Sequence, residues 1–297
     1  MLKNGIYEQV VNNKIKTELL KADDKFIEQT YIDEEEASKI LSQYISSVIE
    51  NKLDNIKERN GKIKKQIELT NKIIETLSSN SADEFNELAV DEGAQQLLAV
   101  LEKKNNILAF RNSGKTTRPE TSLAQSSLFT GAKHEPSLFS EFKKEILSCD
   151  RIDMLVSFIK WSGLRLIIEE LREFTQNGGE LRVITTSYMG ATDIKAIEEL
   201  RVLPNTKIKV SYDTKTTRLH AKTYVFYRGT GFTTAYVGSS NLSNAAISNG
   251  LEWNVKVTEK DLPETIKKIS ATFENYWNSE EFKLYSEPLP LEGAEIK

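Results

Sequence analysis

Residues 152–212 read IDMLVSFIKWSGLRLIIEELREFTQNGGELRVITTSYMGATDIKAIEELRVLPNTKIKVSY, and the order of the apolar segments in this stretch decides the predicted fold. Short apolar runs, typical of strands, alternate with amphipathic runs, typical of helices. The predicted strands are residues 152–159, 181–186 and 208–212, and the predicted helices are residues 163–175 and 194–203. Such an order predicts a mostly parallel sheet with right-handed crossovers and with helices on its faces.

Further predicted elements extend this α/β pattern towards the C-terminus. Two more strands are joined by Arg228-Gly229-Thr230-Gly231, a glycine-containing connection typical of a hairpin. These strands are residues 219–227 and 233–238, followed by a strand at 251–257 and a closing helix at 262–277. The expected fold class is therefore α/β, with a mixed, mostly parallel sheet flanked by helices.

The chain divides by composition into four predicted parts. Apolar residues recur at helical spacing in the first part, and the second is rich in Ser, Thr, Gly and Pro, as connectors are. The fourth part is charged and carries two prolines. We expect a helical N-terminal region at 1–110, a connector at 111–135, the α/β domain at 136–278, and a tail or linker at 279–297.

The composition favours a soluble cytoplasmic protein without a membrane segment. Cys149 is the only cysteine, so no intramolecular disulfide forms, and no run approaches the ~20 apolar residues of a membrane span. The formal net charge is −4, so a nucleic-acid partner has to be argued from a local basic patch. The stretch from 207 to 228 contains six basic residues and one acidic residue, Asp213. The basic residues are Lys207, Lys209, Lys215, Arg218, Lys222 and Arg228. A solvated strand edge protected by lysines is the alternative.

Four separated residues form the candidate catalytic set. His220 and Lys222 lie two apart on a predicted strand, so both side chains point to one face. The next strand ends in Gly238-Ser239-Ser240-Asn241, and a glycine turn into a helix start presents backbone N–H groups to an anion. Glu252 follows on the next predicted strand. Together they supply a nucleophile, a cation, phosphate donors and a carboxylate, whereas each alone is an ordinary structural residue.

These residues resemble the HKD motif of the phospholipase D superfamily. The resemblance rests on His220-Ala221-Lys222, Gly238-Ser239-Ser240-Asn241 and Glu252. Residues 118–278 are similar to the HKD nuclease domain at the start of some superfamily 2 helicases. The segments that carry this likeness are 156–159 (VSFI), 185–193 (TTSYMGATD), 218–222 (RLHAK) and 250–254 (GLEWN).

The resemblance implies a phospholipase D-like fold and a metal-independent phosphodiesterase that cleaves DNA through a covalent phosphohistidine. His220 would be the nucleophile, and Lys222 and Asn241 would stabilise the phosphoryl oxygens. Phosphate would also bind at Ser239 and Ser240. We expect nucleic-acid contacts from Lys215, Arg218 and Tyr188. No cofactor is expected, and no catalytic metal, because no carboxylate or His/Cys cluster has metal-ligand spacing.

One position departs from the family pattern. The superfamily places Asp five positions after the motif lysine, where this chain has Tyr227. We therefore expect Glu252 to supply the carboxylate that orients His220.

The implied mechanism needs two histidines, and the chain has only His134 and His220. His134 has no lysine two positions later, so the second histidine is expected from another copy, in a homodimer. A helicase domain or partner is a further expectation, with DNA or RNA as substrate. Two other functions stay open: a catalytically silent nucleic-acid-binding module of a helicase system, and a phospholipid hydrolase.

Overall fold

A computed structural model describes residues 9–21, 27–57, 61–78, 86–100, 116–132, 134–212, 219–243 and 252–285. The chain divides into two compact units, residues 1–98 and residues 99–297. The candidate catalytic residues all belong to the second unit.

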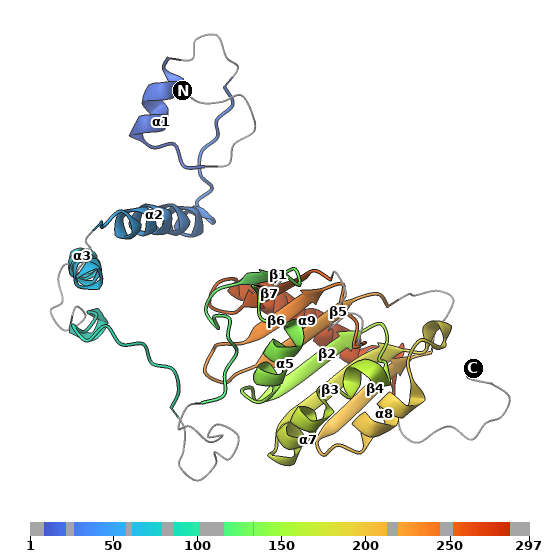
Figure 1. Ribbon diagram of the computed structural model, residues 1–297. Helices are drawn as coiled ribbons and strands as arrows, with labels where there is room; N and C mark the ends of the chain where they lie inside the picture. Colours follow the sequence, from blue (N-terminus) through green and yellow to red (C-terminus); the bar gives the residue numbers. More distant parts are fainter. Residues whose placement is uncertain are drawn as a thin grey trace. The chain divides into compact units, whose positions relative to one another are not determined.

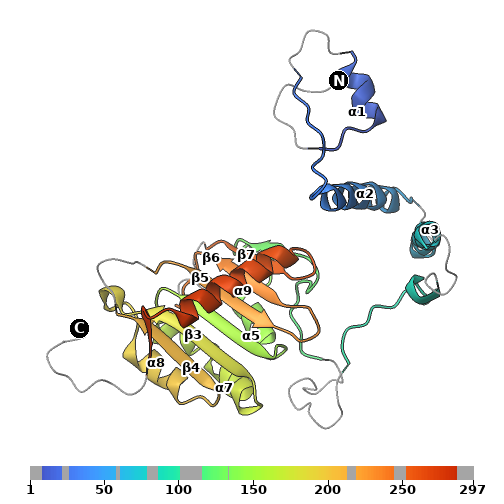
Figure 2. The same ribbon diagram turned by 180° about the vertical axis from the view of Figure 1, so that it is seen from behind.

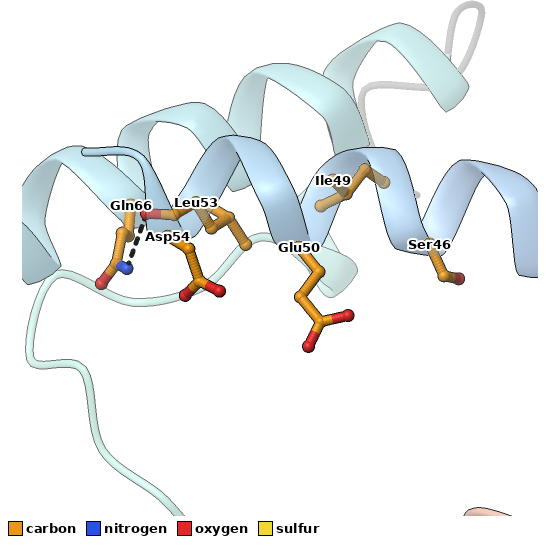
Figure 3. A pocket seen from close by; sticks show the side chains of 6 residues that line it. All are labelled: Ser46, Ile49, Glu50, Leu53, Asp54 and Gln66. Atoms are coloured by element: carbon orange, nitrogen blue, oxygen red, sulfur yellow. Dashed lines mark hydrogen bonds between the residues drawn. The ribbon is translucent and has the colours of Figure 1, made fainter. Parts of the chain in front are cut away.

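The described residues of the first unit include three helices and several non-helical stretches. Its helices are α1 (Asn13–Leu19), α2 (Ala37–Asp54) and α3 (Lys62–Leu77), and none of the three has a buried residue. A groove between α2 and α3 is lined by Ser46, Ile49, Glu50, Leu53, Asp54 and Gln66 (Figure 3). The Gln66 amide bridges the two helices by donating to the Leu53 carbonyl at 3.1 Å. None of these residues belongs to the predicted catalytic set.

The second unit contains a sheet in the strand order β1-β7-β6-β5-β2-β3-β4-β8 (Figure 1). The strands are β1 (Ser127–Phe129), β2 (Arg151–Val156), β3 (Glu180–Thr186), β4 (Thr206–Ser211), β5 (Lys222–Tyr227), β6 (Thr234–Gly238), β7 (Asn254–Thr258) and β8 (Phe282–Leu284). The expected mixed sheet flanked by helices is confirmed.

The expectation of a mostly parallel sheet is wrong. Among the described strands, only β2–β3 and β3–β4 pair in parallel, and the other neighbours are antiparallel. Helical crossovers link β2, β3 and β4, whereas β5 and β6 form a hairpin that adds to the opposite side of β2. The two strands of a hairpin are antiparallel, and β5 also pairs antiparallel with β2. The predicted glycine connection is confirmed, and Gly231 adopts a φ of 76° there.

Helices cover both faces of this sheet. The first face packs against α5 (Leu138–Ile146) and α7 (Ile168–Gln176), and α8 (Ile194–Arg201) lies on the same side (Figure 1). The long helix α9 (Pro263–Asn278) crosses the opposite face (Figure 2). The aliphatic and aromatic side chains that alternate along β2 and β5 therefore enter apolar layers on both sides.

The sheet extends beyond the boundaries that the sequence suggests. Strand β1 lies in the expected connector and pairs with β7, and β8 lies in the expected tail and pairs with β4. The helix expected at 163–175 is also divided, into α6 (Trp161–Leu164) and α7. Residues 111–115 and 286–297 lie outside the described part of the chain.

The strand directions place the candidate functional segments along one row of strand ends, which is called the site edge of the sheet. Strands β2, β3, β4 and β6 end at this edge, while β5 and β7 begin there. The residues after β2 and β6 therefore meet the residues before β5 and β7. This edge corresponds to the carboxyl end of the parallel strands, where α/β proteins bind their ligands.

Candidate active site

His220 and Lys222 meet where β5 begins. The strand starts at Lys222, so His220 precedes it instead of lying on it, as the sequence suggested. Lys222 Nζ lies 3.0 Å from His220 Nδ1 and donates a hydrogen bond to the His220 carbonyl at 2.7 Å. His220 is exposed, whereas Lys222 is only 5% exposed.

Burial affects the charge of Lys222. The loss of water around the ammonium lowers the pKa of Lys222, and the nearby Glu252 carboxylate opposes this shift. Within the described part of the chain, the hydrogen bonds of Lys222 Nζ go to His220 alone. A buried ammonium without an ion-paired carboxylate at hydrogen-bond distance is costly for the folded state, and an incoming anion would offset that cost.

The Gly238-Ser239-Ser240-Asn241 segment turns sharply after β6. A Cβ on Gly238 would lie 2.3 Å from the Trp253 carbonyl oxygen, so only glycine fits. Ser239 is exposed at the edge, consistent with the phosphate contact expected of it. Ser240 is fully buried, and its Oγ accepts a 2.8 Å hydrogen bond from the Asn254 amide. Ser240 thereby helps to hold the segment, and the phosphate contact expected of it stays a prediction.

Asn241 lies at the end of this segment with its carboxamide fixed. Its Oδ1 accepts a hydrogen bond from the Phe158 N–H at 3.3 Å, and the residue is 8% exposed. Because the oxygen faces the backbone after β2, the amide nitrogen keeps its two N–H groups for another acceptor. The sequence predicted Asn241 as an oxyanion donor, and this orientation suits that task.

Glu252 lies just before β7, which begins at Asn254, and not on the strand as expected. Its Oε2 accepts a hydrogen bond from Ser239 Oγ. It also acts electrostatically on Lys222 and on Tyr224. Between the described residues the structure gives Glu252 no hydrogen bond to His220, so its role in orienting the imidazole stays a prediction.

In the described part of the stretch from 207 to 228, the basic side chains do not all lie on the surface. Arg228 is buried and donates to Glu145 at 2.6 Å. Lys209 donates to the Trp277 carbonyl at 2.5 Å. Both cations serve the fold, because each is held by a partner within the unit. Lys215 and Arg218 lie outside the described residues.

Tyr188 lies at the same sheet edge, in the short 3-10 helix η1 (Tyr188–Gly190) that follows β3. Its N–H donates to Thr186 Oγ1 at 3.0 Å, and its side chain is half-buried. His134 is exposed in a turn after β1.

Tyr227 is remote from the candidate site. It ends β5, the strand that Lys222 begins, so the two lie about 17 Å apart at the strand's usual rise. The Tyr227 hydroxyl donates to Ser270 Oγ at 3.1 Å, and its ring stacks under the Arg151 guanidinium. The family's aspartate position therefore maps onto a structural contact with α9.

Sequence reasoning missed two residues that position the site. The Tyr224 hydroxyl donates to the Ser240 carbonyl at 3.0 Å, and Asn254 holds Ser240 Oγ. The signal for Tyr224 was its place two residues after Lys222, which puts both on one face of β5. Asn254 was visible as the last residue of the GLEWN segment.

Two features of the described residues bear on cofactors and membranes. No group of three or more His, Cys, Asp or Glu side chains gathers there as a metal site would require. In the same residues, no helix has the length and apolar character needed to span a membrane.

Part of this chain is similar to a described protein family. Residues 143–277 match the family model described as "Cardiolipin synthase, PLD-like domain". No curated protein matches the chain significantly.

Several solved structures are similar to this chain. NucT from Helicobacter pylori is 20% identical, with a TM-score of 0.39, over 52% of this chain and 96% of that one. Nuc from Salmonella typhimurium, a phospholipase D family member, is 18% identical, with a TM-score of 0.42, over 55% and 100%. Yeast tyrosyl-DNA phosphodiesterase is 14% identical, with a TM-score of 0.30, over 44% and 31%. Residues 143–277 of this chain are thus similar to a phospholipase D-like domain.

Proposed function

We propose that the α/β unit is a metal-independent phosphodiester hydrolase, a nuclease that cleaves DNA. The observation that carries the proposal is the meeting of His220, Lys222 and Asn241 at one sheet edge. Lys222 brings a buried ammonium and Asn241 an oriented amide, and both donate hydrogen bonds of the kind that phosphoryl oxygens accept. The exposed imidazole of His220 lies beside them.

In the first step, a ring nitrogen of His220 attacks phosphorus while the bond from phosphorus to the leaving oxygen breaks. A second histidine donates a proton to that oxygen. Lys222 and Asn241 stabilise the negative charge on the phosphoryl oxygens, and the exposed Ser239 hydroxyl adds a donor. In the second step, water attacks phosphorus and gives its proton to the second histidine as the P–N bond breaks. The phosphomonoester is released and both histidines return to their starting forms.

The second histidine is His220 of another copy, because His134 has no motif around it. An isologous two-fold interface brings the same residue of both copies to one place. An exposed apolar strip near the site edge supports such an interface. Val255 is the cross-strand neighbour of both Leu128 and Val237, all three are exposed, and Trp253 beside them is 63% exposed. Val255→Glu should therefore give a monomer in sedimentation and lose activity. If this variant still forms a dimer, the strip is not part of the interface.

The decisive experiment is plasmid cleavage in excess chelator by the wild type and by His220→Ala. We expect cleavage by the wild type alone. Loss of cleavage on chelation, restored by added Mg²⁺, would reject the metal-independent mechanism. Plasmid binding without turnover would favour the silent binding module. The same assay with an RNA substrate shows whether the protein cleaves DNA, RNA or both.

A phospholipid hydrolase is the second candidate, because the description of the matching family names cardiolipin synthase. Release of headgroup from phosphatidylglycerol vesicles, with no cleavage of plasmid, would favour it. Association with a helicase and a cytoplasmic location stay predictions of the sequence.

A further inference from the structure

We propose that Lys160, Trp161 and Lys195 form a flanking site, which binds the nucleic-acid strand next to the scissile phosphate. The inference rests on the proposed nuclease function and adds the residues that hold the rest of a polynucleotide substrate.

The flanking site adjoins the segment that carries Asn241. Ile159 and Leu242 form a parallel bridge, and the Lys160 N–H donates to the Leu242 carbonyl at 2.9 Å. A Cβ on Gly163 would lie 2.5 Å from Ser243, so α6 contacts this segment without a side chain between them. Paired segments lie about 4.8 Å apart, and a nucleotide adds about 3.4 Å along a strand. The nucleotides beside a phosphate at Asn241 are therefore within reach of Lys160 and Trp161.

The chemistry of the flanking site suits a nucleic-acid strand. Lys195 is exposed, and its Nζ lies 4.4 Å from the centre of the half-buried Trp161 ring. The Lys160 side chain is 36% exposed. Proteins that bind single strands combine cations that track the backbone with aromatic rings on which bases stack. The Lys195 ammonium over the indole, with Lys160 next to Trp161 in the chain, provides that combination at the edge where the proposed catalytic residues lie.

Asp193 holds the flanking site together. Its Oδ2 accepts from the Trp161 N–H at 2.8 Å, and its Oδ1 lies 3.1 Å from Lys160 Nζ. The Asp193 N–H donates in turn to the Ile159 carbonyl at 2.8 Å. Burial alone would raise the pKa of Asp193, but the Trp161 N–H and the Lys160 ammonium lower it. A carboxylate held in this way fixes the start of α8 beside the segment after β2, which places Lys195 over Trp161.

The experiment compares the wild type with a Lys160→Ala/Lys195→Ala double variant on two substrates. One is a fluorescein-labelled single-stranded 20-mer, and the other is bis(p-nitrophenyl) phosphate, a diester too small to reach the flanking site. We expect the variant to bind the 20-mer at least 10-fold more weakly by anisotropy. The slope of log K against log salt should fall by about 1.4, or ~0.7 for each lost single-strand phosphate contact. Hydrolysis of the small diester should stay within twofold of the wild type.

Lys267→Ala is the matched control, because Lys267 is an exposed lysine ion-paired with Glu264 on α9. Equal 20-mer affinity and salt slope in the double variant and this control would overturn the inference. So would parallel losses on both substrates, which indicate a structural role. Trp161→Phe keeps a ring against the core and should weaken 20-mer binding less than Trp161→Ala. A wild type that binds the 20-mer through these lysines but hydrolyses neither substrate would refute the proposed function alone.

Discussion

Lys222 Nζ lies 3.0 Å from His220 Nδ1, so the proposed phosphate-binding cation and the proposed nucleophile contact each other in the protein without substrate. An ammonium can only donate, and Nδ1 must then be the acceptor. The hydrogen of a neutral imidazole is thereby placed on Nε2, which deprives Nε2 of its nucleophilic lone pair. We expect a substrate phosphate that binds the Lys222 ammonium to release Nδ1, so that the hydrogen can move to Nδ1 and Nε2 can act as the nucleophile.

The first prediction is that a phosphate analogue switches this tautomer. Orthovanadate should bind Lys222 and Asn241 and draw the ammonium from Nδ1. In ¹⁵N NMR spectra of protein with labelled histidine, the His220 signals should change from the Nε2–H to the Nδ1–H pattern on saturation. His134, exposed and distant in sequence, is the internal control. Identical His220 signals with and without bound vanadate would contradict the switch.

The second prediction is that Lys222→Met loses activity and gains stability. Removing a donor to the phosphoryl oxygens should lower kcat by about 10²–10³-fold. Because burial lowers the pKa of Lys222, the unfolded chain binds this proton more tightly, and the charged lysine costs stability at neutral pH. That cost is relieved as pH rises past the folded pKa. The variant should therefore melt above the wild type at pH 7, with a smaller difference at pH 10.

Lys267→Met serves as the control for this comparison, since Lys267 is exposed on α9. It should leave kcat unchanged, and its melting temperature relative to the wild type should be the same at pH 7 and pH 10. A Lys222→Met protein that melts below the wild type at pH 7 would show that the ammonium stabilises the fold.

The third prediction separates the two partners of the Ser239–Glu252 hydrogen bond. If Glu252 orients His220 during turnover, Glu252→Gln should lower kcat by about 10²-fold, in the range of acid–base effects, and leave DNA affinity nearly unchanged. Ser239→Ala frees the carboxylate but removes one donor, so its kcat should fall less. Steady-state kinetics give kcat for each variant, and parallel binding measurements give its DNA affinity. Equal losses of kcat and affinity in Glu252→Gln would assign the carboxylate a structural role.

The fourth prediction concerns Glu145, a fully buried carboxylate of α5. It accepts from Arg228 Nη2 at 2.6 Å and lies 3.0 Å from Lys256 Nζ. Burial alone would raise its pKa, but these two cations lower it overall. Glu145→Ala leaves both cations without this partner, so the free energy of unfolding should fall by about 3–5 kcal/mol. Exposed Glu264→Ala, measured by the same urea titration, should change it by less than about 0.5 kcal/mol.

The pH dependence of this effect follows from the direction of the shift. A carboxylate with a lowered folded pKa stabilises the protein above its unfolded pKa, about 4.3, and the contribution is lost as pH falls through the folded value. The loss caused by Glu145→Ala should therefore shrink at pH 3. A constant difference between pH 7 and pH 3 would argue against the ion pairs as its source.

The sequence predicted the central strands because their signals are local. Residues 152–159 and 181–186 are apolar runs, and the glycines between β5 and β6 specify a hairpin. Strands β1 and β8 have only three residues each, too few for a periodic pattern, and only their pairing with β7 and β4 makes them strands. Directions of strands depend on the same long-range pairing, so the antiparallel side of the sheet was not visible.

For the candidate site too, the parts with local sequence signals were predictable, and the parts that depend on long-range pairing were not. His220 and Lys222 were found from their two-residue spacing, and Asn241 from the glycine turn that ends the next predicted strand. The burial of Ser240 and the Glu252–Ser239 hydrogen bond depend on how β6 and β7 pair beyond Gly238. Asp193 ends the 185–193 segment, but its structural role was not predictable, because its contacts with Trp161 and Lys160 lie more than 30 residues away in sequence.

The last prediction is that wild-type and His220→Ala subunits cannot form an active heterodimer. If one copy supplies the nucleophile and the other the general acid, a dimer with one His220 lacks one of the two groups. Heterodimers isolated through two different affinity tags should show only a few per cent of the wild-type rate, while doubly tagged wild type keeps it fully. Independent sites would instead leave half the rate, because one intact His220 would then suffice. A fully active wild-type monomer in sedimentation would likewise exclude a shared site, since its proton donor would have to come from within one chain.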